Sequence, residues 1–230
     1  MNYKIVGDSD CPLLEVRLQK GELVKLERGA MAYMAGVSLS GKMNSNKKGL
    51  GGFLSAVGRS LTSGESMFIT EAVGEDHQGV LGIAPGIPGK IICIPVGERQ
   101  YCLNTGAFLA CDAGVSYKMI SQDLGKAFFG GTGGLFVMET EGTGDLMVNA
   151  FGDIIELEVT PDRPMTIDNE HVVAWDSTLQ YNIAIASGTF GFTTGEGLVN
   201  RFTGNGKVLI QTRNIHSLAD EVKPFISTQS

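Results

Sequence analysis

The sequence has few of the residues from which metal, redox and nucleic-acid sites are commonly built. It contains three histidines, never two within five residues, and four cysteines, none in a Cys-x-x-Cys pair. Zinc and cupin-type sites need clustered imidazole or thiolate ligands, so this pattern argues against them. The net charge is −7, with 18 basic and 25 acidic residues, which disfavours binding to a phosphate backbone. We therefore expect no metal, no other cofactor and no nucleic-acid partner.

Long apolar segments are also missing. Asp8 and Asp10 interrupt the N-terminal region before an apolar run develops, which argues against a signal peptide. The uncharged stretch 177–195 carries Ser, Thr, Gln, Asn and three glycines, and is too polar to span a membrane. The scattered cysteines are expected to be small buried apolar residues of a reducing compartment. Together these features predict a cytoplasmic protein.

Glycine and alternating apolar residues are what the sequence does have. There are 32 glycines in 230 residues and 43% apolar residues, while charged residues reach only 19%. This composition excludes a disordered chain and a coiled coil. Residues 173–185 alternate with the period of a half-buried strand, and compact glycine turns recur at 142–144 and 204–206. We expect an all-β protein with one short C-terminal helix, in which Ser217 is a candidate N-cap.

The chain also reads as a threefold repeat. The stretches that open at Leu18, Leu103 and Ile167 carry apolar residues at matching offsets, and a strand–glycine turn–strand segment follows each of them. In the third stretch Trp175 falls on a core position. The predicted units are 1–98, 99–162 and 163–230, and the first is enlarged by an insertion at 36–63.

An acid follows the same core position in each aligned stretch. These acids are Glu27, Asp112 and Asp176. The favoured interpretation is structural, because an acid beside a turn accepts backbone N–H groups and fixes the hairpin. The alternative is a group of three carboxylates at one end of a pseudo-threefold axis, able to hold a cation.

Several segments resemble the "altered inheritance of mitochondria" family. They are GEGLVNRFTGNGKVLIQTRN at 195–214, LQKGELVKLERGAMAYM at 18–34, and the glycine-rich segments at 49–68 and 125–140. The resemblance covers nearly the whole chain. It implies three tandem short double-stranded β-helix repeats in a pseudo-threefold relation, similar to the subunit of the tryptophan RNA-binding attenuation protein. It further implies a homotrimer, hence a ring of nine units, and it brings no catalytic residues. The fungal namesake is mitochondrial and linked to inner-membrane organisation, whereas this sequence lacks a basic transit peptide.

The insertion at 36–63 is the most individual part of the sequence. It carries four cations and no acid, and apolar residues recur at helical spacing between positions 50 and 61. The favoured interpretation is a connector that packs on its own sheet or on a neighbouring chain. The alternative is a basic amphipathic element that binds an anionic membrane surface or an acidic partner. Its contact residues would be Lys42, Lys47, Lys48, Phe53, Leu54 and Arg59.

Four classes of function follow. The favoured class is a non-enzymatic scaffold or interaction protein that forms a symmetric β assembly and recruits an unidentified protein partner. The alternatives are a ligand- or RNA-binding ring by analogy with the attenuation protein, which is an argument from fold alone, and a weak binder of anionic membranes through 42–61. An enzyme with dispersed catalytic residues is the least favoured class.

Overall fold

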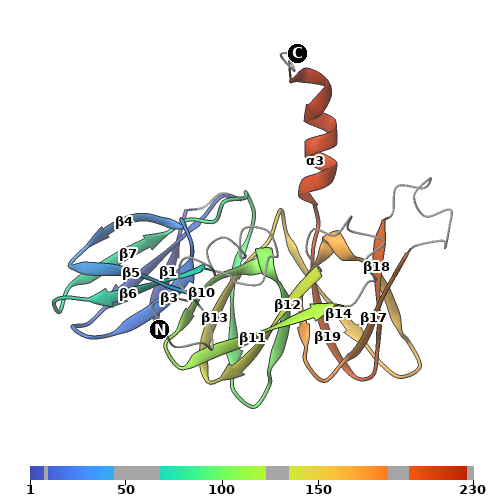
Figure 1. Ribbon diagram of the computed structural model, residues 1–230, viewed down its shortest axis with the longest axis horizontal. Coiled ribbons are helices and arrows are strands. Elements are labelled where there is room, and N and C mark those ends of the chain that lie inside the picture. The colour runs from blue at the N-terminus through green and yellow to red at the C-terminus, as the bar shows by residue number, and fades with distance from the viewer. Residues whose placement is uncertain (8–9, 44–67, 123–134, 186–196, 227–230) are drawn as a thin grey trace, which may run out of the picture.

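The computed structural model describes residues 1–7, 10–43, 68–122, 135–185 and 197–226. Most of these residues lie in antiparallel strands, which confirms the predicted all-β class, and one α-helix stands near the C-terminus (Figure 1). The strands form four sheets.

The four sheets contain nineteen strands among the described residues. The first sheet has the order β1-β2-β7-β4, with β1 Asn2–Val6, β2 Leu13–Leu18, β7 Gly79–Ile83 and β4 Met31–Ala35. The second has the order β5-β6-β3-β10-β13-β8, with β5 Val37–Met43, β6 Phe68–Gly74, β3 Leu23–Glu27, β10 Phe108–Asp112, β13 Gly144–Asn149 and β8 Ile91–Val96. The third has the order β11-β12-β9-β16-β19-β14, with β11 Val115–Gln122, β12 Leu135–Gly142, β9 Tyr101–Asn104, β16 Val172–Asp176, β19 Gly206–Gln211 and β14 Ile154–Val159. The fourth has the order β15-β18-β17, with β15 Met165–Asp168, β18 Leu198–Thr203 and β17 Gln180–Ile185.

The first and fourth sheets lie at opposite ends of the longest axis of the molecule. β4 and β7 are at one end, and β17 and β18 are at the other (Figure 1). Short 3-10 turns precede β10 and β16, at Thr105–Ala107 (η1) and Asn169–His171 (η2). The chain therefore builds its sheets one after another along this axis.

The core consists of three clusters of buried residues, and most of the aromatic ring contacts lie in the cluster next to the fourth sheet. Trp175 is buried, and its ring meets Phe202 edge-on at a centroid distance of 5.5 Å and Tyr181 at 4.9 Å. Trp175 therefore occupies the core position expected from its place on an alternating strand.

Two of the four cysteines lie deep in this core. Cys102 and Cys111 are buried free thiols, and burial raises the pKa of each to about 12. Both are neutral at physiological pH and pack as small apolar residues. Cys11 is exposed, and Cys93 is half-buried.

Strand pairing recurs along the chain. Leu26 of β3 lies opposite Ala110 of β10, and Leu103 of β9 lies opposite Ala174 of β16. An irregularity in register also recurs on β4, β10 and β16, between Met31 and Tyr33, between Phe108 and Ala110, and between Val172 and Ala174. These matches relate β4, β10 and β16 to one another and β3 to β9. β15 corresponds to β3 and β9 by its place beside β18, as β3 lies beside β6 and β9 beside β12.

This correspondence corrects the alignment of the first stretch. Leu26 matches Leu103, whereas Leu18 lies on β2 opposite Gly79 of β7. The error has a physical cause. Apolar residues on strands repeat every two positions, so a slip from Leu26 back to Leu18 still places apolar residues on apolar residues.

The C-terminal helix α3 spans Ile215–Val222 and continues into a 3-10 turn, η4, at Lys223–Phe225. Its N-cap is Asn214, whose side-chain oxygen accepts the backbone N–H of Ser217 at 2.7 Å. Ser217 was the predicted cap and instead lies within the first turn. The prediction missed because asparagine caps as well as serine does, and Asn214 stands three residues earlier.

Candidate interaction surfaces and binding cavity

Most residues of the predicted basic element lie outside the described residues. These are Lys47, Lys48, Phe53, Leu54 and Arg59. Lys42 lies on β5 opposite Ile69 of β6, but its side chain is not described. The membrane-binding interpretation of the insertion stays a prediction. Within the described part of the chain, no helix is long and apolar enough to cross a membrane.

Two of the three predicted acids occupy matching places. The Oδ2 atom of Asp112 accepts the backbone N–H of Asp145 at 2.7 Å, and Oδ2 of Asp176 accepts that of Lys207 at 2.9 Å. Each carboxylate thus ties the end of one strand to the start of its neighbour in the sheet, β10 to β13 and β16 to β19. The adjoining turn residue must be glycine at Gly144, where φ is +142° and a Cβ atom would lie 2.7 Å from Cβ of Asp112.

Glu27 does not share this place, so its predicted equivalence with Asp112 and Asp176 is wrong. The matching register puts Ala35 of β4 there, and Glu27 instead ends β3. The three carboxylates therefore do not form one group. Among the described residues no three His, Cys, Asp or Glu side chains lie close enough together to hold a metal ion.

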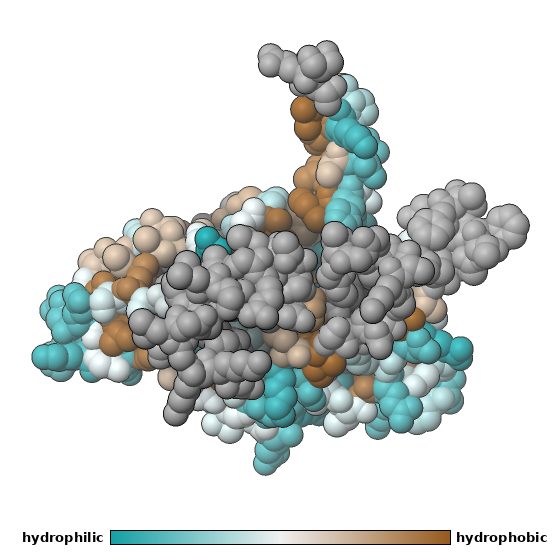
Figure 2. Space-filling view, viewed as in Figure 1, coloured by the Kyte–Doolittle hydropathy of each residue, from teal (hydrophilic) through white to brown (hydrophobic). Residues whose placement is uncertain are grey.

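The first candidate surface is β4, the outermost strand of its sheet. Met31, Tyr33 and Met34 are 38%, 40% and 45% exposed. The matching side chains on β10 and β16 are at most 3% exposed; they are Phe108, Ala110, Cys111, Val172, Ala174 and Trp175. An apolar, unpaired strand edge is a template for pairing with another chain. Figure 2 shows hydrophobic residues over this end of the molecule.

The second candidate surface is β15, at the other end. Among the described strands it pairs with β18 alone. Its equivalents β3 and β9 pair on both sides, with β6 and β10 in one case and with β12 and β16 in the other. The unpaired edge of β15 therefore corresponds to the edge through which β3 pairs with β10 and β9 pairs with β16.

Helix α3 presents a third apolar surface. It projects away from the sheets (Figure 1), and one flank of it is hydrophobic (Figure 2). Ile215, Leu218 and Val222 are each more than 40% exposed, and Phe225 is 87% exposed. Their spacing places all four on one side of the helix. Nothing within the described residues covers this side.

A cavity of about 530 Å³ opens beside the base of α3, where the ends of β3, β9, β13 and β19 meet. This volume is in the range of small-molecule sites. Its described lining comprises Glu27, Gly86, Ile87, Asn104, Thr105, Gly106, Ala107, Phe136, Asn149, Phe151, Asn169, Glu170, Val172, Val173, Gln211 and Ile215.

Most polar groups of the cavity wall are engaged with the protein. Asn104 donates from Nδ2 to the carbonyl oxygen of Val172 at 2.6 Å. Asn169 accepts at Oδ1 from Nδ2 of Asn200 at 2.9 Å. Gln211 accepts the backbone N–H of Phe151 at 2.9 Å and donates to the carbonyl oxygen of Glu170. These amides build the wall and hold its shape.

Two polar groups of the wall are not engaged. The Asn149 side chain is only 3% exposed, and its Oδ1 atom has no hydrogen-bond partner. The side chain of the half-buried Glu27 makes no hydrogen bond or ion pair with any other described residue, and burial raises the pKa of its carboxyl group. A buried acceptor left without a donor is costly, and Oδ1 of Asn149 is enclosed by protein rather than open to the cavity.

The sequence carried little signal for this pair. The repeat pattern places Glu27 in the wrong set of positions, and no motif in the sequence marks Asn149. A polar residue that closes the apolar run Leu146–Val148 was the available hint, but a single sequence does not reveal which strand end lies beside which.

Comparisons of this chain with known proteins show its family and agree with its fold. The model of a family described as mitochondrial biogenesis AIM24 matches residues 3–213. The chain belongs to the AIM24 family. A similar AIM24 relative is an uncharacterized protein of Streptococcus pyogenes serotype M6, 46% identical over 232 residues, a match that covers 100% of this chain and 93% of the relative. A crystal structure of a Streptococcus pyogenes protein is 42% identical and superposes with a TM-score of 0.81 over 98% of this chain and 99% of that one. This AIM24 protein thus shares its fold with bacterial relatives over essentially its full length.

Proposed function

We propose that this AIM24 protein is a non-enzymatic scaffold whose copies join head to tail into a closed β ring, most simply a homotrimer. The surfaces of such a ring would then recruit a protein partner. The proposal combines the strand correspondence within one chain with the two open sheet edges at its ends.

In this proposal the chain consists of three copies of one unit, with the short double-stranded β-helix architecture of the attenuation protein. The units are β2–β7, β8–β13 and β14–β19. The repeated pairing supports this division, because the trios β5-β6-β3, β11-β12-β9 and β17-β18-β15 have the same strand order. The first unit is the longest because 24 residues separate β5 from β6, whereas 12 separate β11 from β12 and 12 separate β17 from β18.

The observation that carries the proposal is that the two end sheets are complementary halves. Inside the chain, each six-stranded sheet joins a trio from one unit to three strands of the next, at the contacts β3–β10 and β9–β16. In the fourth sheet, the edge of β15 is not joined to strands of another unit. In the first sheet, the edge of β4 is not joined to a trio. If β15 of one copy pairs with β4 of the next, the missing six-stranded sheet is completed.

The internal contacts also fix the register of this pairing. Leu26 and Leu103 lie opposite Ala110 and Ala174, so Ile167 is expected to lie opposite Tyr33 of the next copy. Thr166 is then opposite Met34, and Met165 is opposite Ala35. This register would bury the exposed side chains of β4 in the way that their equivalents on β10 and β16 are buried.

A head-to-tail contact produces a ring when its rotation closes and a filament when it does not. The two ends lie at opposite extremes of the long axis, as such a contact requires (Figure 1). The family resemblance favours closure with three chains. The apolar flanks of three α3 helices could then pack around a common axis.

Native mass spectrometry of the full chain tests this proposal. A single chain has a mass of 24.4 kDa, so we expect one dominant species of about 73 kDa at micromolar concentration, with little monomer. A dominant monomer would refute the proposal, and a continuous series of larger species would refute closure of the ring.

A further inference from the structure

The outer edge of β2 is covered by a strand of the same chain, whereas the matching edges of two other strands are open. β2, β8 and β14 match one another because each is separated by one strand from β4, β10 or β16. β1 pairs antiparallel with the outer edge of β2. β8 and β14 end the second and third sheets, and none of the described strands pairs with their outer edges. The same edge is thus filled once and left open twice.

The register shows which residues of these edges correspond. In each strand one residue lies opposite a glycine of the neighbouring strand: Leu18, Val96 and Val159. The residues directly before them are therefore equivalent: Arg17, Pro95 and Glu158. The residues two positions earlier are equivalent as well: Glu15, Cys93 and Glu156. On β2, Arg17 lies opposite Asn2 of β1, and Glu15 lies opposite Lys4.

A proline blocks the open edge of β8. Lys90, just before this strand, donates its backbone N–H to the carbonyl oxygen of Gly152 and accepts the backbone N–H of Ala150, so its backbone groups face the side of β13. Backbone groups alternate between the two sides of a strand, and those of Pro95, five residues on, therefore face outward. Proline has no N–H to donate, and its presence on an edge strand hinders pairing with a further strand.

The open edge of β14 has no such block. Thr212, which follows β19, donates its backbone N–H to the carbonyl oxygen of Asp153 at 3.0 Å. By the same alternation, the backbone groups of Ile154, Glu156 and Glu158 face away from β19. All three residues keep both the N–H and the carbonyl group. β14 therefore offers a complete row of donors and acceptors to an incoming strand.

The side chains along this edge are acidic. The Glu156 side chain is 53% exposed and forms an ion pair with Lys207 of the neighbouring strand, whereas Glu158 is exposed and has no ion pair among the described residues. On β2 the equivalent of Glu156 is Glu15, whose Oε1 atom lies 3.1 Å from Nζ of Lys4 on β1. Pairing between two copies of β14 would set acids beside acids and is disfavoured, whereas a basic strand is complementary.

We propose that the outer edge of β14 binds an extended, basic segment of a partner protein, which adds to the third sheet as an antiparallel strand. Its basic side chains lie opposite Glu156 and Glu158, as Lys4 lies opposite Glu15. The main-chain hydrogen bonds supply the affinity, and the charges select the partner. The inference rests on the proposed function in taking the partner to be a protein, but every residue that carries it belongs to one chain.

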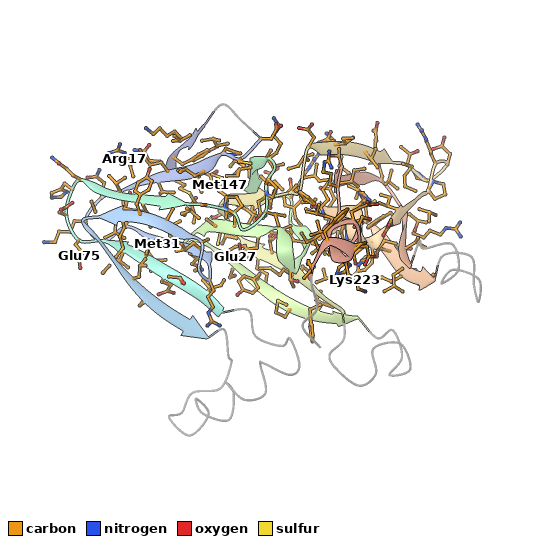
Figure 3. All side chains as sticks on the ribbon, turned by 90° about the horizontal axis from the view of Figure 1, so that it is seen from above. Arg17, Glu27, Met31, Glu75, Met147 and Lys223 are labelled. Atoms are coloured by element: carbon orange, nitrogen blue, oxygen red, sulfur yellow. The ribbon has the colours of Figure 1, made fainter. Side chains whose placement is uncertain are left out.

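This edge is distinct from the edges that would join the ring. β2 and β4 flank β7, and Figure 3 shows Arg17 of β2 and Met31 of β4 on opposite sides of the first sheet. β14 likewise lies on the side of β19 away from β16. β1 keeps three of its five residues exposed although it lies beside the second unit, so a strand on β14 is expected to be reached from solvent in the same way.

The test is fluorescence anisotropy of two fluorescein-labelled peptides titrated with the full-length protein. The basic peptide, acetyl-Lys-Tyr-Lys-Ile-Val-Gly-amide, is based on residues 2–7 and has lysine in the places of Asn2 and Lys4. The acidic peptide has glutamate in both places. We expect saturable binding of the basic peptide at low salt and binding about tenfold weaker, or none, for the acidic peptide.

Two variants and one control locate the site. Glu158→Pro gives β14 the proline that β8 carries at the matching position, so it should keep the β spectrum of the parent protein and weaken binding of the basic peptide about tenfold or more. Glu158→Lys keeps the N–H but reverses the charge and should weaken binding several-fold, which decides the matter if the proline variant does not fold. Glu75→Lys, the same change at an exposed acid near one end of the molecule (Figure 3), should leave binding unchanged. Equal binding of both peptides, or unchanged affinity in the Glu158 variants, would overturn the proposal.

The Met34→Asp variant separates this inference from the ring. Because the site lies within one chain, we expect similar affinity for the basic peptide in the parent protein and in this variant. No binding by a parent protein that is trimeric in native mass spectrometry would refute the strand site and leave the ring intact. Binding by a parent protein that is monomeric would support the strand site and refute the ring. Binding by Met34→Asp alone would show that assembly covers β14 and would overturn its role in recruiting a partner.

Discussion

Replacing Met34 with aspartate is expected to turn the assembled protein into a folded single chain. Met34 is 45% exposed in the isolated chain, so the chain alone tolerates the change. In the proposed ring it takes the place held by Cys111 and Trp175 in the internal contacts, where both side chains are buried. An unpaired carboxylate buried there would cost several kcal/mol. Association should weaken about a hundredfold or more, because about 1.4 kcal/mol corresponds to a factor of ten.

Native mass spectrometry measures the oligomeric state of Met34→Asp, and circular dichroism shows whether the variant is folded. The expected outcome is a 24.4 kDa species with an unchanged β spectrum. Ile155→Asp is the matched control, because Ile155 is also 45% exposed but lies on β14, a strand that takes no part in the proposed contact between β15 and β4. If Met34→Asp keeps the oligomeric mass of the parent protein, β4 is not the contact strand.

Removing the Trp175 ring is expected to cause the largest loss of stability of any single change considered for this chain. Trp175 is 2% exposed and packs against Phe202 and Tyr181. Truncation leaves a cavity between β16 and the fourth sheet and removes two edge-on aromatic contacts. Trp175→Ala should lower the free energy of unfolding by about 3–5 kcal/mol.

Circular dichroism melts at one fixed protein concentration measure this loss, since the only tryptophan is the residue removed. For a chain of this size the melting temperature should fall by about 6–20 °C. Ile155→Ala, a truncation at an exposed strand position, should shift it by only a few degrees. A comparable shift in both variants would show that the aromatic cluster does not anchor the core.

Local patterns in the sequence were sufficient to predict the class of fold. Alternation around Trp175 predicted strands and a core position, and glycines such as Gly144 marked the turns. The same alternation could not fix the register of the first stretch, because Leu18 and Leu26 fit the period equally well. The residue type alone also did not distinguish Asn214 from Ser217 as the helix cap.

The sites depend on contacts between distant segments, and a single sequence does not record these. Glu27 and Asn149 line one cavity only because β3 and β13 flank β10 in the second sheet. Met34 reads as one more apolar strand residue until its sheet is seen to end at β4. The predicted basic residues between Lys47 and Arg59 lie outside the described part of the chain, so their role stays a prediction.

Disulfide trapping between the two open edges tests the head-to-tail contact most directly. Residues directly opposite in antiparallel strands have Cα atoms about 4.5–5.5 Å apart, within the range that a disulfide spans. A chain with Met34→Cys and Thr166→Cys, in a Cys11→Ser background, should oxidise to covalent dimers and trimers on a non-reducing gel, and each single variant should stay monomeric there. Covalent species absent from the double variant, or equally abundant when Ile155→Cys replaces Thr166→Cys, would contradict the pairing of β15 with β4.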